Sequence, residues 1–278
     1  MSNPRLNLLG KEIIIFLLTQ ALGLFVAWRL WERRVVEYVP IEKAGGLALY
    51  DFLLAFALAT VLIIIFLKLP GKSALIFELM FVFSVFIGAD IVFEALLPQA
   101  PALVLAVIVA LLRFLAPRVW AQNFVIIISV AGVAAWLGLS MTLQVAMSIL
   151  ILLSIYDVIA VYKTKHMVVM MKGMMERGVY FSIIVPEKTK NFLSHLGAAR
   201  PGEGFMFLGT GDIAFPLIFA ASALKYSFIS SIAIVIGALL GIIAVHILFI
   251  TQRERRPMPA LPPIVLGAII GFLVSRII

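Results

Sequence analysis

Two aspartates lie inside segments that are otherwise apolar enough to be buried in lipid. Asp157 lies within Leu152–Val161, and Asp212 lies within Leu208–Phe215. Placing a carboxylate at membrane depth costs from about 2.5 kcal/mol upward, so such residues usually have a partner or a function. Two carboxylates that meet can share one proton and carry out acid–base chemistry on a water molecule. We therefore take these two aspartates as the candidate catalytic residues.

The residues next to each aspartate suit such a site. Gly209 and Gly211 lie on either side of Thr210, just before the second aspartate. A glycine costs a helix about 1 kcal/mol relative to alanine, and it lets another backbone approach closely. Tyr156 precedes the first aspartate; it either offers its hydroxyl to substrate or water or is an aromatic residue of the membrane interface. These four residues are candidate site-shaping positions.

The composition is that of a polytopic membrane protein. Of the 278 residues, 64% are hydrophobic and only 13% are charged, and the mean hydropathy is +1.17. Soluble chains carry about 25% charged residues. Because positive residues gather on the cytoplasmic side of membrane proteins, the net charge of +8 is explained by topology, and we expect no nucleic-acid partner.

Cysteine and histidine usage excludes several kinds of site. The chain has no cysteine, which excludes disulfides, thiolate catalysis and cysteine metal sites. The three histidines, His166, His195 and His246, lack metal-ligand spacing. We therefore expect neither a metal nor a cofactor. The N-terminal apolar run lacks a small-residue cleavage site, so we interpret it as a retained first span.

The apolar runs predict an all-α polytopic fold with nine transmembrane helices in a single transmembrane domain over residues 1–278. Residues 1–142 hold the first five helices, and residues 143–278 hold the last four together with a loop over 163–204. The predicted spans are Ile13–Trp28, Leu47–Leu67, Leu75–Leu96, Ala102–Leu115, Asn123–Ser140, Val145–Tyr162, Phe205–Leu224, Ser230–Ile250 and Ala260–Ile277.

The basic residues predict the orientation of these spans. Sixteen of the 22 Lys and Arg residues fall on one side of the nine-span arrangement, seven of them between Lys163 and Arg200. The side that carries most Lys and Arg is cytoplasmic. We therefore expect a multi-pass protein of the cell membrane with its N-terminus in the cytoplasm and its C-terminus outside.

The loop over 163–204 is the only long connection between the predicted spans. It contains an apolar stretch, Met167–Met171, and the β-branched and aromatic stretch Val179–Val185. The second stretch predicts a short strand, with a loop lying on the surface as the alternative. Residues Pro201–Gly204 then break the chain before the seventh span.

The two aspartates are predicted to lie at one level of the membrane. Asp157 comes six residues before Lys163, and Asp212 comes eight residues after Gly204. At the helical rise of 1.5 Å per residue these separations are depths of roughly 9 and 12 Å from the same membrane face. Because both depths are measured from the cytoplasmic loop, the two carboxylates can meet within reach of cytoplasmic water.

A proline-rich segment leads into the ninth span. Residues Pro257–Pro263 contain four prolines, which leave backbone carbonyls without helical partners. Such backbone occurs at membrane depth only where protein or water lines it. Within the segment, Pro259, Ala260 and Leu261 are candidates for an edge that docks substrate.

These residues together resemble the three signatures of the intramembrane aspartyl proteases, the family of presenilin and signal peptide peptidase. The signatures correspond to Tyr156-Asp157, to the Gly-x-Gly-Asp run Gly209–Asp212, and to Pro259–Leu261, in the expected order on the expected spans. The cytoplasmic N-terminus and the Leu261-Pro262 pair favour the presenilin branch, closest to a prokaryotic presenilin homologue. Thr210 departs from the leucine that presenilins usually carry. Spans one to five carry no signature.

The resemblance implies an aspartic endopeptidase that hydrolyses peptide bonds within transmembrane proteins or peptides in the lipid bilayer. Asp157 and Asp212 would then be the catalytic dyad. One ionised carboxylate would act as general base on water while the protonated one donates to the peptide carbonyl. Because the two carboxylates would interact strongly, they would titrate as one unit.

The alternative function is an ion- or proton-coupled transporter or a leak channel, since intramembrane acids also mark ion paths. Glu78, Asp90 and Glu94 in the third predicted span favour it. However, Asp90 and Glu94 lie near the outer end, where we expect them to be solvated, and Glu78 can pair with Lys72. A catalytically silent scaffold is a third possibility.

Two glycine pairs have the small-xxx-small spacing of closely packed membrane helices. They are Gly237 with Gly241 and Gly267 with Gly271. We interpret both as packing within the chain; the alternative is a surface for dimer formation.

Overall fold

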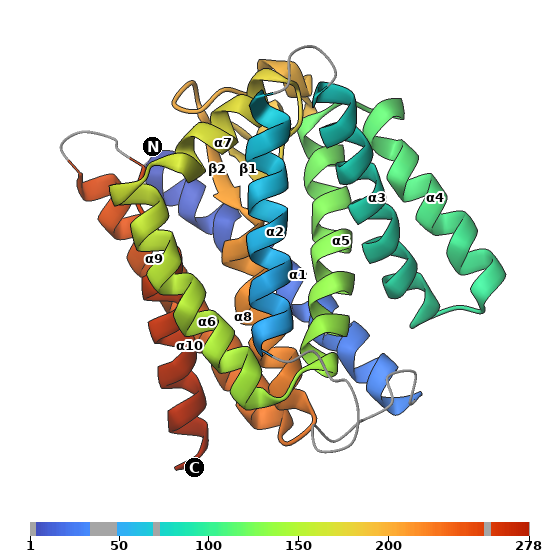
Figure 1. The fold of residues 1–278 in the computed structure, drawn as a ribbon, viewed down its shortest axis with the longest axis vertical. Helices are drawn as coiled ribbons and strands as arrows, with labels where there is room; N and C mark the ends of the chain where they lie inside the picture. The colour runs from blue at the N-terminus through green and yellow to red at the C-terminus, as the bar shows by residue number, and fades with distance from the viewer. Residues whose placement is uncertain (1–3, 34–48, 69–72, 253–256, 278) are drawn as a thin grey trace.

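The computed structural model describes residues 4–33, 49–68, 73–252 and 257–277, and it is mostly helical (Figure 1). Within these residues, six helices are long and apolar enough to cross a membrane, and three more are shorter apolar helices. In chain order the elements are α1 (Pro4–Glu32), α2 (Leu49–Lys68), α3 (Ser73–Glu94), α4 (Gln99–Leu115), α5 (Val119–Ser140), α6 (Leu143–Val158), a π-helical turn (Ile159–Lys163), α7 (His166–Glu176), β1 (Ser182–Pro186), 3-10 turns at Thr189–Leu193 and Leu196–Ala198, β2 (Phe205–Gly209), α8 (Thr210–Leu224), α9 (Phe228–Thr251) and α10 (Leu261–Ser275).

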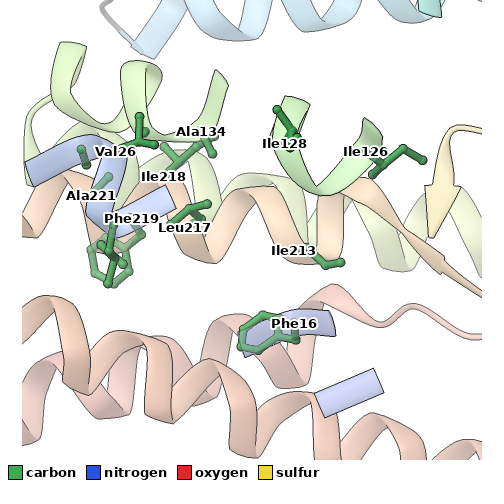
Figure 2. Packing of buried hydrophobic residues seen from close by; sticks show 14 of the residues in the cluster. Phe16, Val26, Ile126, Ile128, Ala134, Ile213, Leu217, Ile218, Phe219 and Ala221 are labelled. Carbon is green, nitrogen blue, oxygen red and sulfur yellow. The ribbon is translucent and has the colours of Figure 1, made fainter. Parts of the chain in front are cut away.

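The helix that carries the second aspartate lies in the interior of the bundle. In α8, every residue from Pro216 to Ala223 is buried. Helix α1 packs closely against it, because a Cβ at Gly23 would lie 2.3 Å from Cδ2 of Leu217. Figure 2 shows Leu217 in one buried cluster with Phe16 of α1 and Ile128 of α5. The interior of the protein thus fixes α8, and with it the position of Asp212.

The expectation that the seventh span is helical from Phe205 was wrong. Residues Phe205–Gly209 form strand β2, and the helix begins only at Thr210. The apolar run is equally compatible with a buried strand, and strand formation depends on a pairing partner that local sequence does not reveal. That partner is β1, which pairs antiparallel with β2 so that Ile184 lies opposite Phe207.

The loop over 163–204 is built from regular elements. The predicted strand is confirmed, although it spans Ser182–Pro186, and the apolar stretch before it lies in helix α7. The side chain of Asn123 completes the sheet, because its Nδ2 donates to Ile184 O and its Oδ1 accepts from Ile184 N–H, both at 2.8 Å. The Ile184–Phe207 pair is then of the non-hydrogen-bonded kind, so the N–H and C=O of Phe207 point away from β1.

Helices α9 and α10 pack at backbone contact through the predicted glycine pairs. A Cβ at Gly237 would lie 2.1 Å from Gly267 O, and one at Gly271 would lie 2.1 Å from Ala233 O. A Cβ at Gly241 would lie 2.5 Å from Ile264 Cα. The interpretation of these glycines as packing within the chain is confirmed.

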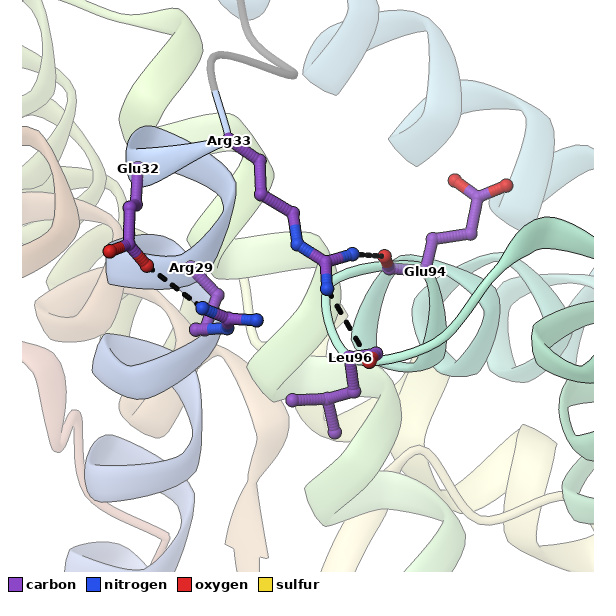
Figure 3. A network of polar contacts seen from close by, with 5 residues as sticks. All are labelled: Arg29, Glu32, Arg33, Glu94 and Leu96. Atoms are coloured by element: carbon purple, nitrogen blue, oxygen red, sulfur yellow. Dashed lines mark hydrogen bonds and ion pairs between the residues drawn. The ribbon is translucent and has the colours of Figure 1, made fainter.

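The C-terminal end of α1 is joined to the C-terminal end of α3 by polar contacts (Figure 3). Arg29 pairs with Glu32 at 2.8 Å, and Arg33 donates to the carbonyl oxygens of Glu94 and Leu96 at 3.1 and 3.5 Å. This end of the bundle lies opposite the end that holds the sheet (Figure 1).

The acids of α3 are placed differently from the prediction. Asp90 is half-buried, and its Oδ1 is buried without a hydrogen-bond partner among the residues that the structure describes, so the expectation that Asp90 is solvated was wrong for this oxygen. Glu94 is half-buried. Glu78 acts electrostatically on Arg113, whereas Lys72, its predicted partner, lies outside the described residues.

Candidate active site

Asp157 lies one residue before the end of α6, where the helix changes to a π-helical turn over Ile159–Lys163. Such turns are rare and often occur at functional sites. The side chain is buried, and Oδ2 accepts a hydrogen bond from the N–H of Leu261 at 3.1 Å. A main-chain donor from α10 therefore holds this carboxylate inside the protein.

Asp212 is the third residue of α8 and is half-buried. Its carboxylate accepts a hydrogen bond from the backbone N–H of Gly209, the residue that caps the helix. This is the return bond of a capping box, in which a side chain in the first turn satisfies a donor at the helix start. Gly209 must lack a side chain here, because a Cβ would lie 2.9 Å from Oδ2 of Asp212.

The two carboxylates are neighbours, as the sequence predicted, although the depth argument behind that prediction does not hold for Asp212. A strand, which rises about 3.3 Å per residue, separates Gly204 from Asp212, so a depth based on the helical rise does not apply. Asp157 nevertheless acts directly on Asp212 through its charge. Among the described residues, no group of three or more His, Asp or Glu side chains could hold a metal ion.

The proline-rich segment meets the first aspartate. Pro259 and Leu261 are buried, Ala260 is the capping residue of α10, and Pro262 follows in the first turn. The first N–H groups of a helix have no partner inside the helix, and its N-terminal end favours negative charge. The N-terminal end of α10 provides such donors to Asp157, since the backbone N–H groups of Ala260 and Leu261 both contact its carboxylate.

Tyr156 and Thr210 connect the site to the loop region. The hydroxyl of Tyr156 is 2.6 Å from Nε2 of His166 on α7, and its ring packs edge-on against Phe56 of α2 at 5.2 Å. Thr210 donates from Oγ1 to Phe181 O at 3.4 Å, just before β1. Tyr156 therefore links the site to helix α7, and Thr210 links it to the segment just before β1.

A set of polar residues on α1 and α9 was not predicted from the sequence. Lys11 donates to the carbonyl oxygens of Pro186 and Glu187, both at 2.8 Å, and Gln20 donates to Ile213 O at 2.9 Å. Glu12 is paired with His246, and both are buried. Glu12 is a carboxylate at the start of an apolar run, whereas the two aspartates lie inside one, and none of the three signatures includes it.

Comparisons with known proteins identify the family and the fold of the chain. The profile of the family described as signal-peptide peptidase, presenilin aspartyl protease matches residues 13–278. A solved structure of a presenilin family intramembrane aspartate protease in space group C222 is 22% identical, with a TM-score of 0.63 and 94% of each chain covered. A second such structure, in space group P2, is also 22% identical, with a TM-score of 0.65, and covers 95% of this chain and 96% of the other. No curated protein matches the chain.

The fold and the family profile define a multi-pass membrane protease. The chain belongs to the signal-peptide peptidase and presenilin family of aspartyl proteases, since the family profile covers nearly its whole length. The two solved structures, which are 22% identical to the chain, show that it has a presenilin-like fold. The prediction of an intramembrane aspartyl protease is thereby confirmed.

Proposed function

We propose that Asp157 and Asp212 are the catalytic dyad and that they hydrolyse peptide bonds within the transmembrane segments of other membrane proteins. The observation that carries this proposal is the meeting of two intramembrane carboxylates at the adjoining ends of α6 and α8. Each is held by a main-chain N–H, from Leu261 in one case and from Gly209 in the other. Such donors orient both carboxylates without contributing charges of their own.

In the proposed reaction the dyad carries one proton between its two carboxylates. The ionised aspartate takes a proton from water, the water oxygen bonds to the peptide carbon, and the protonated aspartate donates to the carbonyl oxygen. As the intermediate collapses, the C–N bond breaks, the leaving nitrogen takes the proton from the first aspartate, and the second regains its own. The dyad therefore ends each cycle with the single proton with which it began.

The outer edge of β2 is the place where the substrate backbone would be held. The outer edge of β1 is occupied by Asn123, whereas the N–H and C=O of Phe207 on β2 face away from β1. An extended segment can add to such an edge through main-chain hydrogen bonds. Because β2 leads directly into the α8 turn that carries Asp212, a strand added here would bring a peptide carbonyl next to the dyad. We therefore place the docking strand on β2, although the part of the predicted stretch from Ser182 to Val185 also belongs to this sheet.

Pro259, Ala260 and Leu261 are proposed to form the opposite wall of the substrate channel. The backbone of Ala260 and Leu261 contacts Asp157, so a substrate lying along this segment would be aligned with that carboxylate. Tyr156, Gly209, Thr210 and Gly211 are proposed to shape the same channel.

We further propose that all nine predicted spans cross the membrane, with the N-terminus in the cytoplasm and the C-terminus outside. The six long apolar helices and the shorter α4, α8 and α10 support this arrangement. The position of the first and last described residues near opposite ends of the bundle also supports it (Figure 1). Short helices can cross where adjoining non-helical backbone is buried in protein or lines a water-filled cavity, and the partly buried strand β2 adjoins α8.

Cleavage of a single-span reporter peptide by the purified protein tests this function. We expect Asp157→Asn and Asp212→Asn each to reduce cleavage at least about a thousandfold, because neither amide can carry the shared proton. A transition-state analogue of aspartyl proteases should inhibit the wild type. Asp90→Asn is the matched control, since it makes the same substitution in an intramembrane aspartate of α3 that is far in sequence from the dyad. This variant should retain cleavage. Wild-type rates in either dyad variant would refute the assignment.

A further inference from the structure

Two unfavourable pieces of backbone follow each other between Asp157 and helix α7. The turn directly after α6 is π-helical over Ile159–Lys163, and Lys165 has the left-handed backbone angles φ 55° and ψ 8°. Lys165 is the only residue other than glycine with a positive φ in the part of the chain that the structure describes. Both conformations are rare, and they persist where surrounding contacts compensate for their cost, often at functional sites. We therefore looked for the contacts that hold this segment.

His166 provides these contacts. It is the first residue of α7 and follows Lys165 directly. Its Nε2 lies 2.6 Å from the hydroxyl of Tyr156, and its Nδ1 contacts the hydroxyl of Thr164. The rings of His166 and Tyr156 also meet edge to face, with their centroids 5.5 Å apart. One imidazole thus bridges the residue before Asp157 and the residue after the π-helical turn.

The donors and acceptors around this imidazole fit one arrangement of protons. The hydroxyl of Thr164 donates its single proton to Ile159 O at 3.3 Å, and the same carbonyl accepts from the N–H of Thr164 at 3.0 Å. The hydroxyl oxygen then accepts from Nδ1–H of His166. Nε2 of the neutral imidazole is left to accept the proton of the Tyr156 hydroxyl. The hydrogen bonds therefore run in one direction, from Tyr156 through the imidazole to a carbonyl of the π-helical turn.

A displacement of Tyr156 is passed on to Asp157, because the two residues are neighbours in the last turn of α6. The tyrosine ring is held on α2 by its edge-on contact with Phe56 at 5.2 Å, and its hydroxyl is held by His166. The Asp157 carboxylate must keep its 3.1 Å hydrogen bond to the N–H of Leu261 and its place in the dyad. A misplacement of about 1 Å in an active site can cost about a hundredfold in rate.

We propose that His166 is a positioning residue of this protease. By joining Tyr156 to Thr164 across the π-helical turn, it holds the end of α6 in the conformation that directs the Asp157 carboxylate into the dyad. It acts through these two side chains and transfers no proton to the substrate. The inference rests on the proposed dyad and adds to it a residue that lies outside the three signatures.

The test is kcat and KM for the reporter peptide, measured per folded protein. His166→Phe keeps a ring but removes both nitrogens, so we expect kcat to fall about thirtyfold. KM should change less than about twofold, because the proposed substrate-binding edges are untouched. His166→Gln keeps an oxygen that can accept from the Tyr156 hydroxyl, and it should recover most of the lost kcat. His195→Phe is the matched control, since it makes the same substitution at an exposed histidine of the same loop; its kcat should be that of the wild type.

A double-mutant cycle tests whether His166 acts through Tyr156. Tyr156→Phe removes the hydroxyl and keeps the ring that packs against Phe56. In this background His166→Phe should lower kcat by no more than about threefold, because the hydroxyl that it holds is gone. A thirtyfold loss in both backgrounds would overturn the proposal, and so would a wild-type kcat in the His166→Phe single variant.

Thr164→Val is an independent variant in case His166→Phe does not fold. It removes the hydroxyl between the imidazole and Ile159 O and keeps the shape of the side chain. We expect kcat to fall about fivefold, with KM again within about twofold of the wild type. Wild-type kcat in both Thr164→Val and Tyr156→Phe would be sufficient to reject the role of His166.

The outcome is separable from that of the proposed function. If Asp157→Asn and Asp212→Asn abolish cleavage but His166→Phe cleaves at the wild-type rate, only the role of His166 fails. If either aspartate variant still cleaves at the wild-type rate, the dyad itself fails.

Discussion

The glycines beside Asp212 and the glycines between α9 and α10 accommodate different chemical groups. Gly209 leaves space for a carboxylate, since its missing Cβ would lie 2.9 Å from Oδ2 of Asp212. Gly237 and Gly271 leave space for a neighbouring backbone, because a Cβ on either would lie 2.1 Å from a carbonyl oxygen of the facing helix. A carboxylate can rotate away from an added methyl group, whereas a packed helix must move as a whole.

This difference separates function from stability. Near the dyad, main-chain N–H groups and absent side chains fix the direction of a carboxylate, and small displacements affect chemistry. Between α9 and α10, close packing provides dispersion contacts, and small displacements affect the free energy of folding. A glycine-to-alanine substitution near the dyad should therefore lower activity and leave stability in place. The same substitution between α9 and α10 should lower stability and leave activity in place.

Apart from the dyad variants, the largest effect is expected from Gly209→Ala. The backbone angles of Gly209, φ −61° and ψ 138°, suit alanine, so the fold should be retained. The new Cβ would displace the Asp212 carboxylate, and we expect kcat to fall about a hundredfold. Reporter cleavage and thermal unfolding measured on the same sample check this. In Gly211→Ala the Cβ would instead meet the Phe215 ring at 3.0 Å, and we expect a smaller loss. Equal losses would remove the special role of Gly209.

An intermediate effect, on stability alone, is expected from Gly271→Ala. Its Cβ would force α10 away from Ala233 of α9, and overpacking of this kind costs about 2 kcal/mol or more. The kcat of the folded fraction should be unchanged. Gly10→Ala in α1 is the matched control, since nothing lies within 4 Å of the new Cβ; it should gain up to about 1 kcal/mol from helix propensity. Similar melting temperatures for the two variants would contradict the packing argument.

The smallest effect is expected at the far end of α8, where Lys225 donates to the carbonyl oxygens of Leu139 and Met141. Burial lowers the pKa of Lys225 from 10.5 to about 8. Between these values the unfolded chain binds more protons than the folded protein, so the contribution of Lys225 to stability rises as the pH rises from about 8 to 10.5.

Lys225→Met removes this titration. We expect the stability of the wild type relative to the variant to increase over this pH range by on the order of 1 kcal/mol, because the half-buried amine is partly solvated. Melting temperatures of both proteins across the range provide the measurement, and cleavage at neutral pH should be similar. Parallel curves for the two proteins would show that burial does not perturb this amine.

The sequence by itself determined the features that depend on local composition. The apolar runs predicted the helices, and the β-branched run predicted a strand that the structure has at Ser182–Pro186. Carboxylates within apolar runs identified Asp157 and Asp212, and the glycine spacing identified the close packing of α9 and α10. Each of these signals is contained in fewer than about twenty-five consecutive residues, so no knowledge of distant contacts was needed.

Only the tertiary structure decided which distant groups become partners. Phe205–Gly209 is a strand rather than a helix because β1 pairs with it and Asn123 completes the sheet. Leu261 donates to Asp157 across 104 positions of sequence, and Glu12 pairs with His246 across 234. The physical reason is that an apolar run specifies burial but not the neighbour. In a medium without water, each buried polar group must find a partner wherever the packed helices bring one within reach.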